Sequence, residues 1–215
     1  MKAGHRVGLK KILIANTPLL CSALRAALKD EPRFEIDEVH SFLPVLDTVG
    51  KSNPDLIILN MFLGGVSAMD TLSNLKTVHP QLFVLVTGES ENTWALRATR
   101  KGAVGFISLD TAVEHIRPAV ETAFRGELVV SDGILKTALN GLARGEKVGD
   151  PFSQLSDREL EVFSAIGDGK GTRAIAEMLH VSIKTIESHR AHIKEKLHLK
   201  DAAQLTHNAT LWCQK

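Results

Sequence analysis

Apolar positions in the first 125 residues come in short continuous runs that alternate with amphipathic stretches. The runs predict five strands, at 11–15, 34–40, 56–60, 82–88 and 104–109. Four of the five are continuously apolar, which is typical of parallel strands that are covered on both faces. Apolar spacings of three and four predict helices between and after these strands, at 18–30, 42–50, 67–78, 91–101 and 111–125.

This alternation predicts an α/β fold, a doubly wound parallel five-stranded sheet. Pro118 falls inside the last of these helices and should kink that helix or delay its start, because proline lacks the N–H that a helix interior needs.

The pattern changes after residue 126. Residues 126–152 hold one helical stretch, at about 131–143, and then a segment rich in Gly, Lys and Asp that is typical of a linker. No strand pattern remains from residue 153 onward. The expected organisation is therefore an α/β domain at 1–127, a linker with a short helix at 128–152, and an all-α four-helix domain at 153–215.

The last part of the chain predicts a helix-turn-helix. Ser156 and Glu159 form a capping box ahead of the first helix, and GDGKG ends that helix. A short helix, RAIAEMLH, is followed by a tight turn that Ser182 caps. The next helix is longer and has an apolar stripe at Ile186, Ile193 and Leu197. A short helix, a three-residue turn and a longer helix make this motif.

Composition and charge narrow the function without deciding it. The net charge is only +1, so a surface for a polyanion must be local. Residues 170–215 carry 8 Lys or Arg against 4 Asp or Glu, which concentrates positive charge on the turn and the third helix. The two cysteines lie far apart and give no disulfide framework, and Asn16, Thr17 and Pro18 interrupt the N-terminal apolar run before it reaches the length of a signal peptide. These features predict a cytoplasmic protein without a membrane partner.

Several short motifs at a fixed spacing carry a family resemblance. They are LSDRELEV at 155–162, IA at 175–176, SIKTIESHR at 182–190 and KL at 196–197. Together they resemble the LuxR/FixJ-type DNA-binding domain, and with the α/β domain in front the chain resembles a two-domain response regulator of the NarL/FixJ type. The resemblance implies double-stranded DNA as the partner, read in the major groove by a homodimer on paired half-sites.

Helical spacing predicts which side chains of the third helix face DNA. Residues opposite the apolar stripe include Lys184, Glu187, Ser188, Ala191 and Glu195. We expect base contacts from Glu187, Ser188 and Ala191, because Glu accepts from cytosine N4, Ser pairs with several base edges, and the Ala methyl contacts thymine. We expect phosphate contacts from Lys170, Thr172, Ser182, Lys184, Thr185 and Lys194.

Arg190 lies near the apolar stripe, and the sequence leaves two roles open for it. It could form a structural ion pair with an acid of the scaffold, or it could contact phosphate. His189 and His192 have no Cys or carboxylate pattern around them, so no metal site is predicted. GDGKGT lacks the ending and the preceding strand of a phosphate-binding loop, and no cofactor is predicted.

The resemblance also implies a phosphorylation site at the carboxyl ends of the strands of the first domain. Such a site has two acids after the first strand, an acceptor Asp after the third, a Thr or Ser after the fourth and a Lys after the fifth. The acids bind Mg²⁺, which needs carboxylate oxygens. The acceptor must be a carboxylate because phosphorylation forms an acyl phosphate.

Most of these groups are missing from the matching positions. The first strand ends on Ala15 and Asn16, the third ends on Asn60, and Leu109 replaces the Lys; Thr87 and the aromatic Phe106 remain. A single silencing substitution would explain Asn60 and leave the other losses unexplained. The pattern therefore predicts a degenerate receiver domain that is not phosphorylated.

The sequence leaves three possible functions to compare. The leading prediction is a sequence-specific DNA-binding transcription regulator that acts as a dimer without Asp phosphorylation. The alternative is a protein-interaction or ligand-sensing pseudo-receiver that modulates another regulator and binds DNA weakly, with an unidentified protein or small molecule as effector. An enzyme is not expected, because the sequence has no GxSxG, no His/Asp/Ser set near the strand ends and no Gly-rich dinucleotide loop. Candidate dimer surfaces are the fourth and fifth βα units and the last helix, with Leu205, Leu211 and Trp212.

Overall fold

The computed structural model describes residues 9–63, 66–143, 152 and 154–213. They form two compact units, the first made of residues 9–63 and 68–135, and the second made of residues 66–67 together with the described residues from 136 onward. None of the helices in these described residues combines the length and apolar character that crossing a membrane requires.

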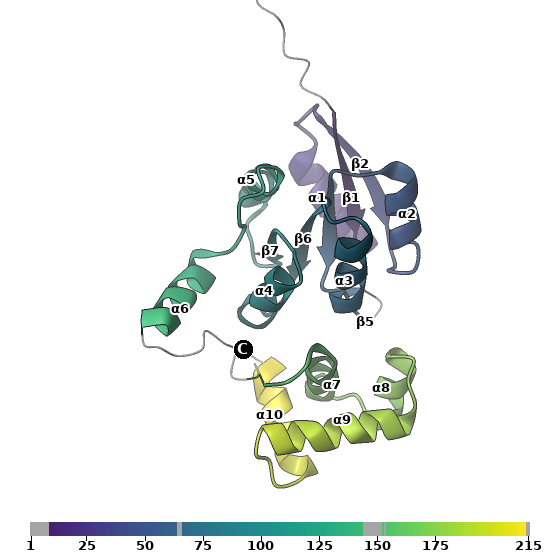
Figure 1. Cartoon of the computed structure of the whole chain (residues 1–215), viewed down its shortest axis with the longest axis vertical. Helices are drawn as coiled ribbons and strands as arrows, with labels where there is room; N and C mark the ends of the chain where they lie inside the picture. Colours follow the sequence, from purple (N-terminus) through teal and green to yellow (C-terminus); the bar gives the residue numbers. More distant parts are fainter. Residues whose placement is uncertain (1–8, 64–65, 144–151, 153, 214–215) are drawn as a thin grey trace, which may run out of the picture. The chain divides into compact units, whose positions relative to one another are not determined.

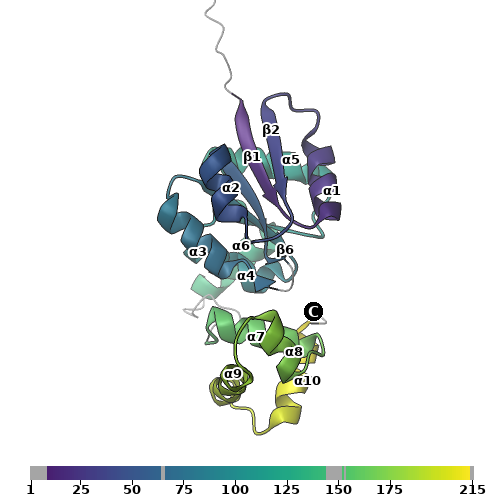
Figure 2. The same cartoon turned by 90° about the vertical axis from the view of Figure 1, so that its right-hand side faces the viewer.

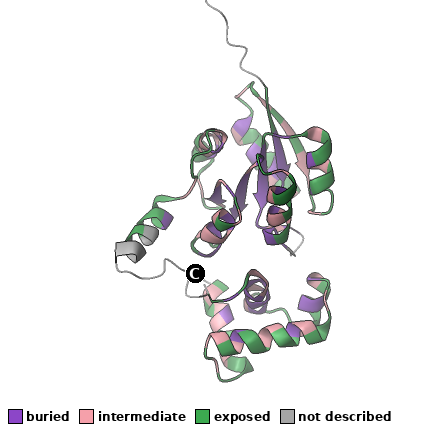
Figure 3. Cartoon of the chain, in the orientation of Figure 1, coloured by how far each residue is buried: buried purple, intermediate pink, exposed green. Residues whose placement is uncertain are grey.

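The first unit is built on a parallel five-stranded sheet. Its strands are β1 (Lys10–Ala15), β2 (Phe34–Val39), β3 (Leu56–Asn60), β6 (Phe83–Gly88) and β7 (Gly105–Ser108), in the order β2-β1-β3-β6-β7. Every residue of β3 is buried, as its continuous apolar run predicts (Figure 3). The predicted doubly wound α/β fold is confirmed.

Five helices cover the two faces of the sheet. They are α1 (Pro18–Leu28), α2 (Val45–Ser52), α3 (Met69–Val78), α4 (Glu91–Arg100) and α5 (Val113–Phe124). Helices α1 and α5 pack on one face, and α2, α3 and α4 lie on the other (Figures 1 and 2). Because successive strand residues point to opposite faces, Ile12 and Ile14 belong to the core beneath α1 and α5.

Three features between residues 62 and 143 differ from the sequence prediction or lie outside it. A small two-stranded sheet pairs β4 (Phe62–Leu63) with β5 (Val66–Ser67), and strands of two residues leave no periodicity to find. Helix α5 begins five positions before Pro118 and continues past it, so this proline does not delay the helix start. Val129 bridges to Gly105, which extends the sheet edge just ahead of α6 (Asp132–Ala143).

The second unit contains the four predicted helices, namely α7 (Asp157–Gly167), α8 (Thr172–Met178), α9 (Ile183–Lys196) and α10 (Ala202–Cys213). Its core includes Phe163, whose ring centroid lies 4.9 Å from that of Phe152 and 5.9 Å from that of Trp212. The predicted capping box is present, because Ser156 accepts from the Glu159 N–H and the Glu159 carboxylate accepts from the Ser156 N–H. Helix α7 therefore starts where the sequence predicts.

Candidate functional site

The turn between α8 and α9 sets the angle at which α9 leaves the scaffold. His180 has a φ of 54°, a left-handed conformation that ends α8 and reverses the chain. Ser182 then caps α9 by accepting the Thr185 N–H at 3.1 Å, as its sequence position predicts. The start of α9 is thereby fixed by local hydrogen bonds.

Helix α9 has one buried side and one exposed side. Ile186 and Ile193 are fully buried, while Leu197 is half-buried and already lies at the end of the helix. The opposite side is exposed, and its residues are those that helical spacing places there: Lys184, Glu187, Ser188, Ala191 and Glu195 (Figure 3). The side chains available to a partner are a cation, two acids, a hydroxyl and a methyl group.

Most of the residues expected at phosphate lie near the start of α8 or of α9. Lys170 is exposed and forms an ion pair with Asp168 at 2.9 Å, and Thr172 is the first residue of α8. Ser182 and Thr185 lie in the first turn of α9, where their hydroxyl oxygens are 2.8 Å apart. Lys194 lies half-buried in the last turn. Backbone N–H groups at helix starts attract anions, so this arrangement is chemically suited to a phosphate backbone.

Arg190 is half-buried, and the structure shows no ion pair between it and any acid of the described residues. Glu159 and Glu161 of helix α7 already form ion pairs with other residues. Glu161 pairs with Arg158 at 2.7 Å, and Glu159 pairs with Lys196 at 2.6 Å. Of the two roles left open for Arg190, the scaffold ion pair is therefore not observed.

The Glu159–Lys196 pair is a feature that the sequence analysis did not identify. It joins the start of α7 to the end of α9, and the Glu159 side chain is nearly fully buried. Burial opposes ionisation of Glu159, but the Lys196 ammonium and the Ser156 N–H and hydroxyl together hold its pKa below the ordinary value. The capping box is visible in the sequence, but only the fold brings Lys196 to it.

The positions that match a phosphorylation site come together at the carboxyl ends of β1, β3 and β6. Asn16 donates from its side-chain nitrogen to the Thr87 hydroxyl at 3.0 Å, and Asn60 donates to the Asn16 side-chain oxygen at 2.5 Å. The Asn60 oxygen accepts the Phe62 N–H at 2.9 Å, and the Asn16 oxygen accepts the Thr17 N–H at 3.0 Å. These bonds form a continuous, uncharged chain from Asn60 through Asn16 to Thr87, which we call the amide network (Asn16, Asn60 and Thr87).

The amide network is buried: Asn16 is 0%, Asn60 6% and Thr87 2% exposed. Buried polar groups of this kind are stable because each finds a partner. Two carboxylates at the Asn16 and Asn60 positions would face each other at hydrogen-bond distance and repel, unless a cation lay between them. Amides pair directly, so the network fills the space between the strand ends without an ion.

The other positions that match a phosphorylation site carry uncharged side chains. Ala15 is fully buried at the end of β1, and Phe106 is buried in β7. Leu109 is 41% exposed, and its N–H donates to the Gly88 carbonyl at 3.0 Å. A leucine at this position provides no ammonium group to neutralise a phosphoryl group.

Comparison with known proteins assigns both units. Residues 12–121 match the family model of the response regulator receiver domain, and residues 153–209 match that of the bacterial regulatory proteins of the luxR family. The oxygen regulatory protein NreC of Staphylococcus haemolyticus is 32% identical over 168 residues, covering 75% of this chain and 77% of that protein. NreC of Staphylococcus carnosus is 29% identical over 181 residues, covering 81% and 83%.

Solved structures agree on the fold. RcsB of Salmonella enterica serovar Typhimurium, bound to the promoter rprA in the presence of phosphomimetic BeF3⁻, aligns with a TM-score of 0.69 at 18% identity, covering 94% of this chain and 98% of that one. RcsB bound to the promoter P1flhDC aligns equally well, at 0.69. On these family matches, this chain belongs to the LuxR-type response regulators, a family of DNA-binding transcription regulators.

Proposed function

We propose that this protein binds specific DNA sequences as a dimer and does so without phosphorylation of an Asp in its receiver domain. In this proposal each segment expected from the sequence has its own role: the receiver-like domain at 1–127, the linker at 128–152 and the DNA-binding domain at 153–215. The observation that carries the proposal is the amide network, because it places an uncharged amide where the acceptor carboxylate belongs.

The loss of phosphorylation follows from three missing contributions. Asn60 has no carboxylate to form an acyl phosphate. Ala15 and Asn16 offer no carboxylate to Mg²⁺, and Leu109 offers no cation to the phosphoryl group. Each loss alone would impair the reaction, and together they remove acceptor, metal and charge neutralisation.

The exposed side of α9 supports sequence-specific binding. In this proposal Glu187, Ser188 and Ala191 contact base edges, and the surrounding residues contact phosphates. The proposed phosphate contacts are Lys170, Thr172, Ser182, Lys184, Thr185, Arg190 and Lys194. A dimer would place two such helices on half-sites about 34–36 Å apart, one turn of DNA.

The experiment compares DNA binding with and without a phosphodonor. A DNA sequence is first selected from genomic fragments with the purified protein. Fluorescence anisotropy on that DNA is then measured at several salt concentrations, in the presence and absence of acetyl phosphate and Mg²⁺. The proposal predicts equal affinity in both conditions and no shift on a phosphate-affinity gel. Binding that requires acetyl phosphate and Mg²⁺ would contradict it.

A further inference from the structure

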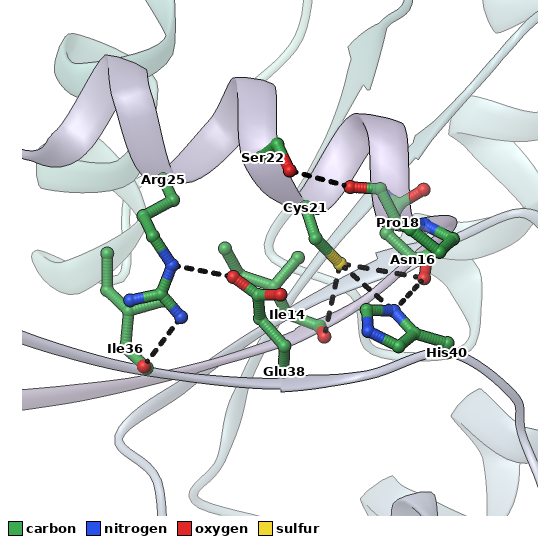
Figure 4. Close-up of polar contacts among 9 residues, drawn as sticks. All are labelled: Ile14, Asn16, Pro18, Cys21, Ser22, Arg25, Ile36, Glu38 and His40. Atoms are coloured by element: carbon green, nitrogen blue, oxygen red, sulfur yellow. Dashed lines mark hydrogen bonds and ion pairs between the residues drawn. The ribbon is translucent and has the colours of Figure 1, made fainter.

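One cluster of metal-ligating side chains lies outside the amide network and is not used by the proposed function. Its members are Cys21 of α1, Glu38 of β2 and His40, which directly follows β2 (Figure 4). One ligand atom from each of the three lies within 4.8 Å of the other two. We call this group the Cys21 cluster.

The fold creates the cluster by two regular spacings. Glu38 and His40 are two residues apart at the end of an edge strand, so both point to the face that α1 covers. Cys21 and Arg25 are four residues apart on α1 and share the helix face that meets them. Neither spacing indicates a metal site in the sequence. Only the packing of α1 against β2 brings a thiol, a carboxylate and an imidazole together.

The geometry points to a binding site for Zn²⁺ formed by Cys21 Sγ, His40 Nδ1 and a carboxylate oxygen of Glu38. The Sγ and Nδ1 atoms lie 3.6 Å apart. Two ligands at the usual Zn–S and Zn–N distances of about 2.3 and 2.0–2.1 Å, at a tetrahedral angle, are separated by about 3.5 Å. The two atoms are therefore already at the spacing that a shared zinc ion requires.

The carboxylate of Glu38 is oriented by a second residue. Arg25 donates from Nε to Glu38 Oε1 at 2.6 Å and from its terminal nitrogen to the Ile36 carbonyl at 3.1 Å. A carboxylate has two oxygens, so an ion can bind the group while Arg25 holds the other oxygen. Such outer hydrogen bonds are typical of metal sites, where they orient the ligands. Three protein ligands leave the fourth tetrahedral position to water.

The three side chains of the Cys21 cluster differ in how far they are buried. Cys21 is fully buried, Glu38 is half-buried and His40 is exposed, so an ion can enter from the His40 side. The donor set of one thiolate, one imidazole and one carboxylate suits a borderline-soft ion such as Zn²⁺ and disfavours Mg²⁺ or Ca²⁺, which take oxygen ligands.

Without an ion, the cluster is held by the Asn16 carbonyl oxygen, which lies 3.5 Å from Cys21 Sγ and 3.1 Å from His40 Nδ1. A carbonyl can only accept, so the thiol and the imidazole are its donors. Zinc binding replaces the Cys21 S–H bond by a Zn–S bond and releases one proton to water, and it requires the His40 tautomer with its proton on Nε2. Burial and then the Glu38 carboxylate raise the pKa of the Cys21 thiol, while the Asn16 hydrogen bond and the Arg25 charge act in the opposite direction.

The site adjoins the amide network through one residue. The carbonyl of Asn16 holds the Cys21 cluster, and its side chain binds Asn60 and Thr87. A zinc ion would thus bind beside the strand ends at which relatives with intact acids would bind Mg²⁺.

The test uses the full chain after removal of metals with a chelator. Titration with Co²⁺ is expected to produce a thiolate-to-cobalt charge-transfer band that saturates at one ion per chain and disappears when Zn²⁺ is added. His40→Gln changes an exposed side chain and Cys21→Ser keeps a hydrogen-bond donor to Asn16, so both should fold, which circular dichroism checks. Cys21→Ser should lose the band because it lacks the thiolate, and His40→Gln should need at least about tenfold more Co²⁺ or Zn²⁺ for half-saturation.

Cys213→Ser is the matched control, because Cys213 is the other cysteine of the chain and lies on α10. This variant should retain the full band. No band at saturating Co²⁺, an unchanged half-saturation concentration in His40→Gln, or loss of the band in Cys213→Ser instead of Cys21→Ser would each overturn the assignment. None of these readouts depends on DNA binding, so the zinc site and the proposed function fail separately.

Discussion

Asn60 donates its side-chain N–H to the side-chain oxygen of Asn16 at 2.5 Å, across the ends of two strands, β3 and β1, that belong to one buried sheet. In a phosphorylated receiver, the matching positions would have carboxylate side chains, and these would bind a metal ion. Here two amides and a hydroxyl satisfy one another, and the site is neutral and closed.

We expect Asn60→Asp to leave phosphorylation at zero and to destabilise the first unit. A carboxylate at residue 60 cannot donate to Asn16 and would be buried without a cation, which costs about 1–3 kcal/mol. Urea unfolding measures the free energy, and a phosphate-affinity gel with acetyl phosphate and Mg²⁺ measures modification.

Asn92→Asp is the control for this change, because Asn92 is exposed in the first turn of α4, where an acidic side chain is favourable and the same substitution should not destabilise the protein. A phosphorylated Asn60→Asp protein would show that the other losses do not disable the site.

The double variant Lys184→Ala, Ser188→Ala should weaken DNA binding at least about tenfold while leaving the fold intact. Both side chains are exposed on α9, and within the part of the chain that the structure describes the Ser188 hydroxyl bonds only to the Lys184 carbonyl of its own helix. Each lost phosphate contact should also reduce the slope of log K against log[salt] by about 0.9. Anisotropy titrations at several salt concentrations provide both quantities.

Lys51→Ala removes an equally exposed cation from α2 and should leave the affinity unchanged. Undiminished binding by the double variant would refute the assignment of α9 as the DNA-reading helix.

Glu159→Gln should reduce the free energy of unfolding of the second unit by about 1–2 kcal/mol at neutral pH. The change breaks a bond to Lys196 that joins α7 to α9, and the loss is limited because Lys196 is itself 39% exposed. Hydrogen exchange of the α7 amides reports on this unit within the full chain. Glu177→Gln, in the exposed pair with Arg173, should change stability by less than about 0.5 kcal/mol.

The effect of Glu159 should depend on pH in a defined direction. Because the pKa of folded Glu159 is lowered, its ionised form contributes stability above the ordinary Glu pKa of about 4.3. That contribution is lost as the pH falls through the lowered value in the folded protein. Wild type and Glu159→Gln should therefore converge in acid, and a constant difference across this range would contradict the assignment.

Gly167→Ala should destabilise the second unit by about 1–3 kcal/mol. A methyl group at this position would overlap the Cys213 sulfur and the Ala209 carbonyl, because α7 and α10 approach closely there. Thermal unfolding measures the change. Gly50→Ala, at an exposed position of α2, meets nothing within 4 Å and should stabilise the first unit by about 0.5–1 kcal/mol, so equal effects of the two variants would rule out the close contact as the cause.

Periodicity determines most of the fold, because it depends on local properties of the chain. The buried run at residues 56–60 becomes β3, the Ser156–Glu159 capping box starts α7, and Ser182 starts α9. The exposed side of α9 also follows from spacing alone, since Ile186 and Ile193 fix the orientation of the helix. The identity of Asn60 is likewise read directly from the chain.

Tertiary structure decides what distant residues do together. Asn16, Asn60 and Thr87 are up to 71 positions apart, and only the β1–β3–β6 order brings their side chains within hydrogen-bond distance. The same holds for the Glu159–Lys196 pair and for the Cys21 cluster. In each case the residues lie on different helices or strands, and nothing in the sequence around one of them indicates the other. Long-range pairing depends on how elements pack, and a helix or strand period carries no information about its partner.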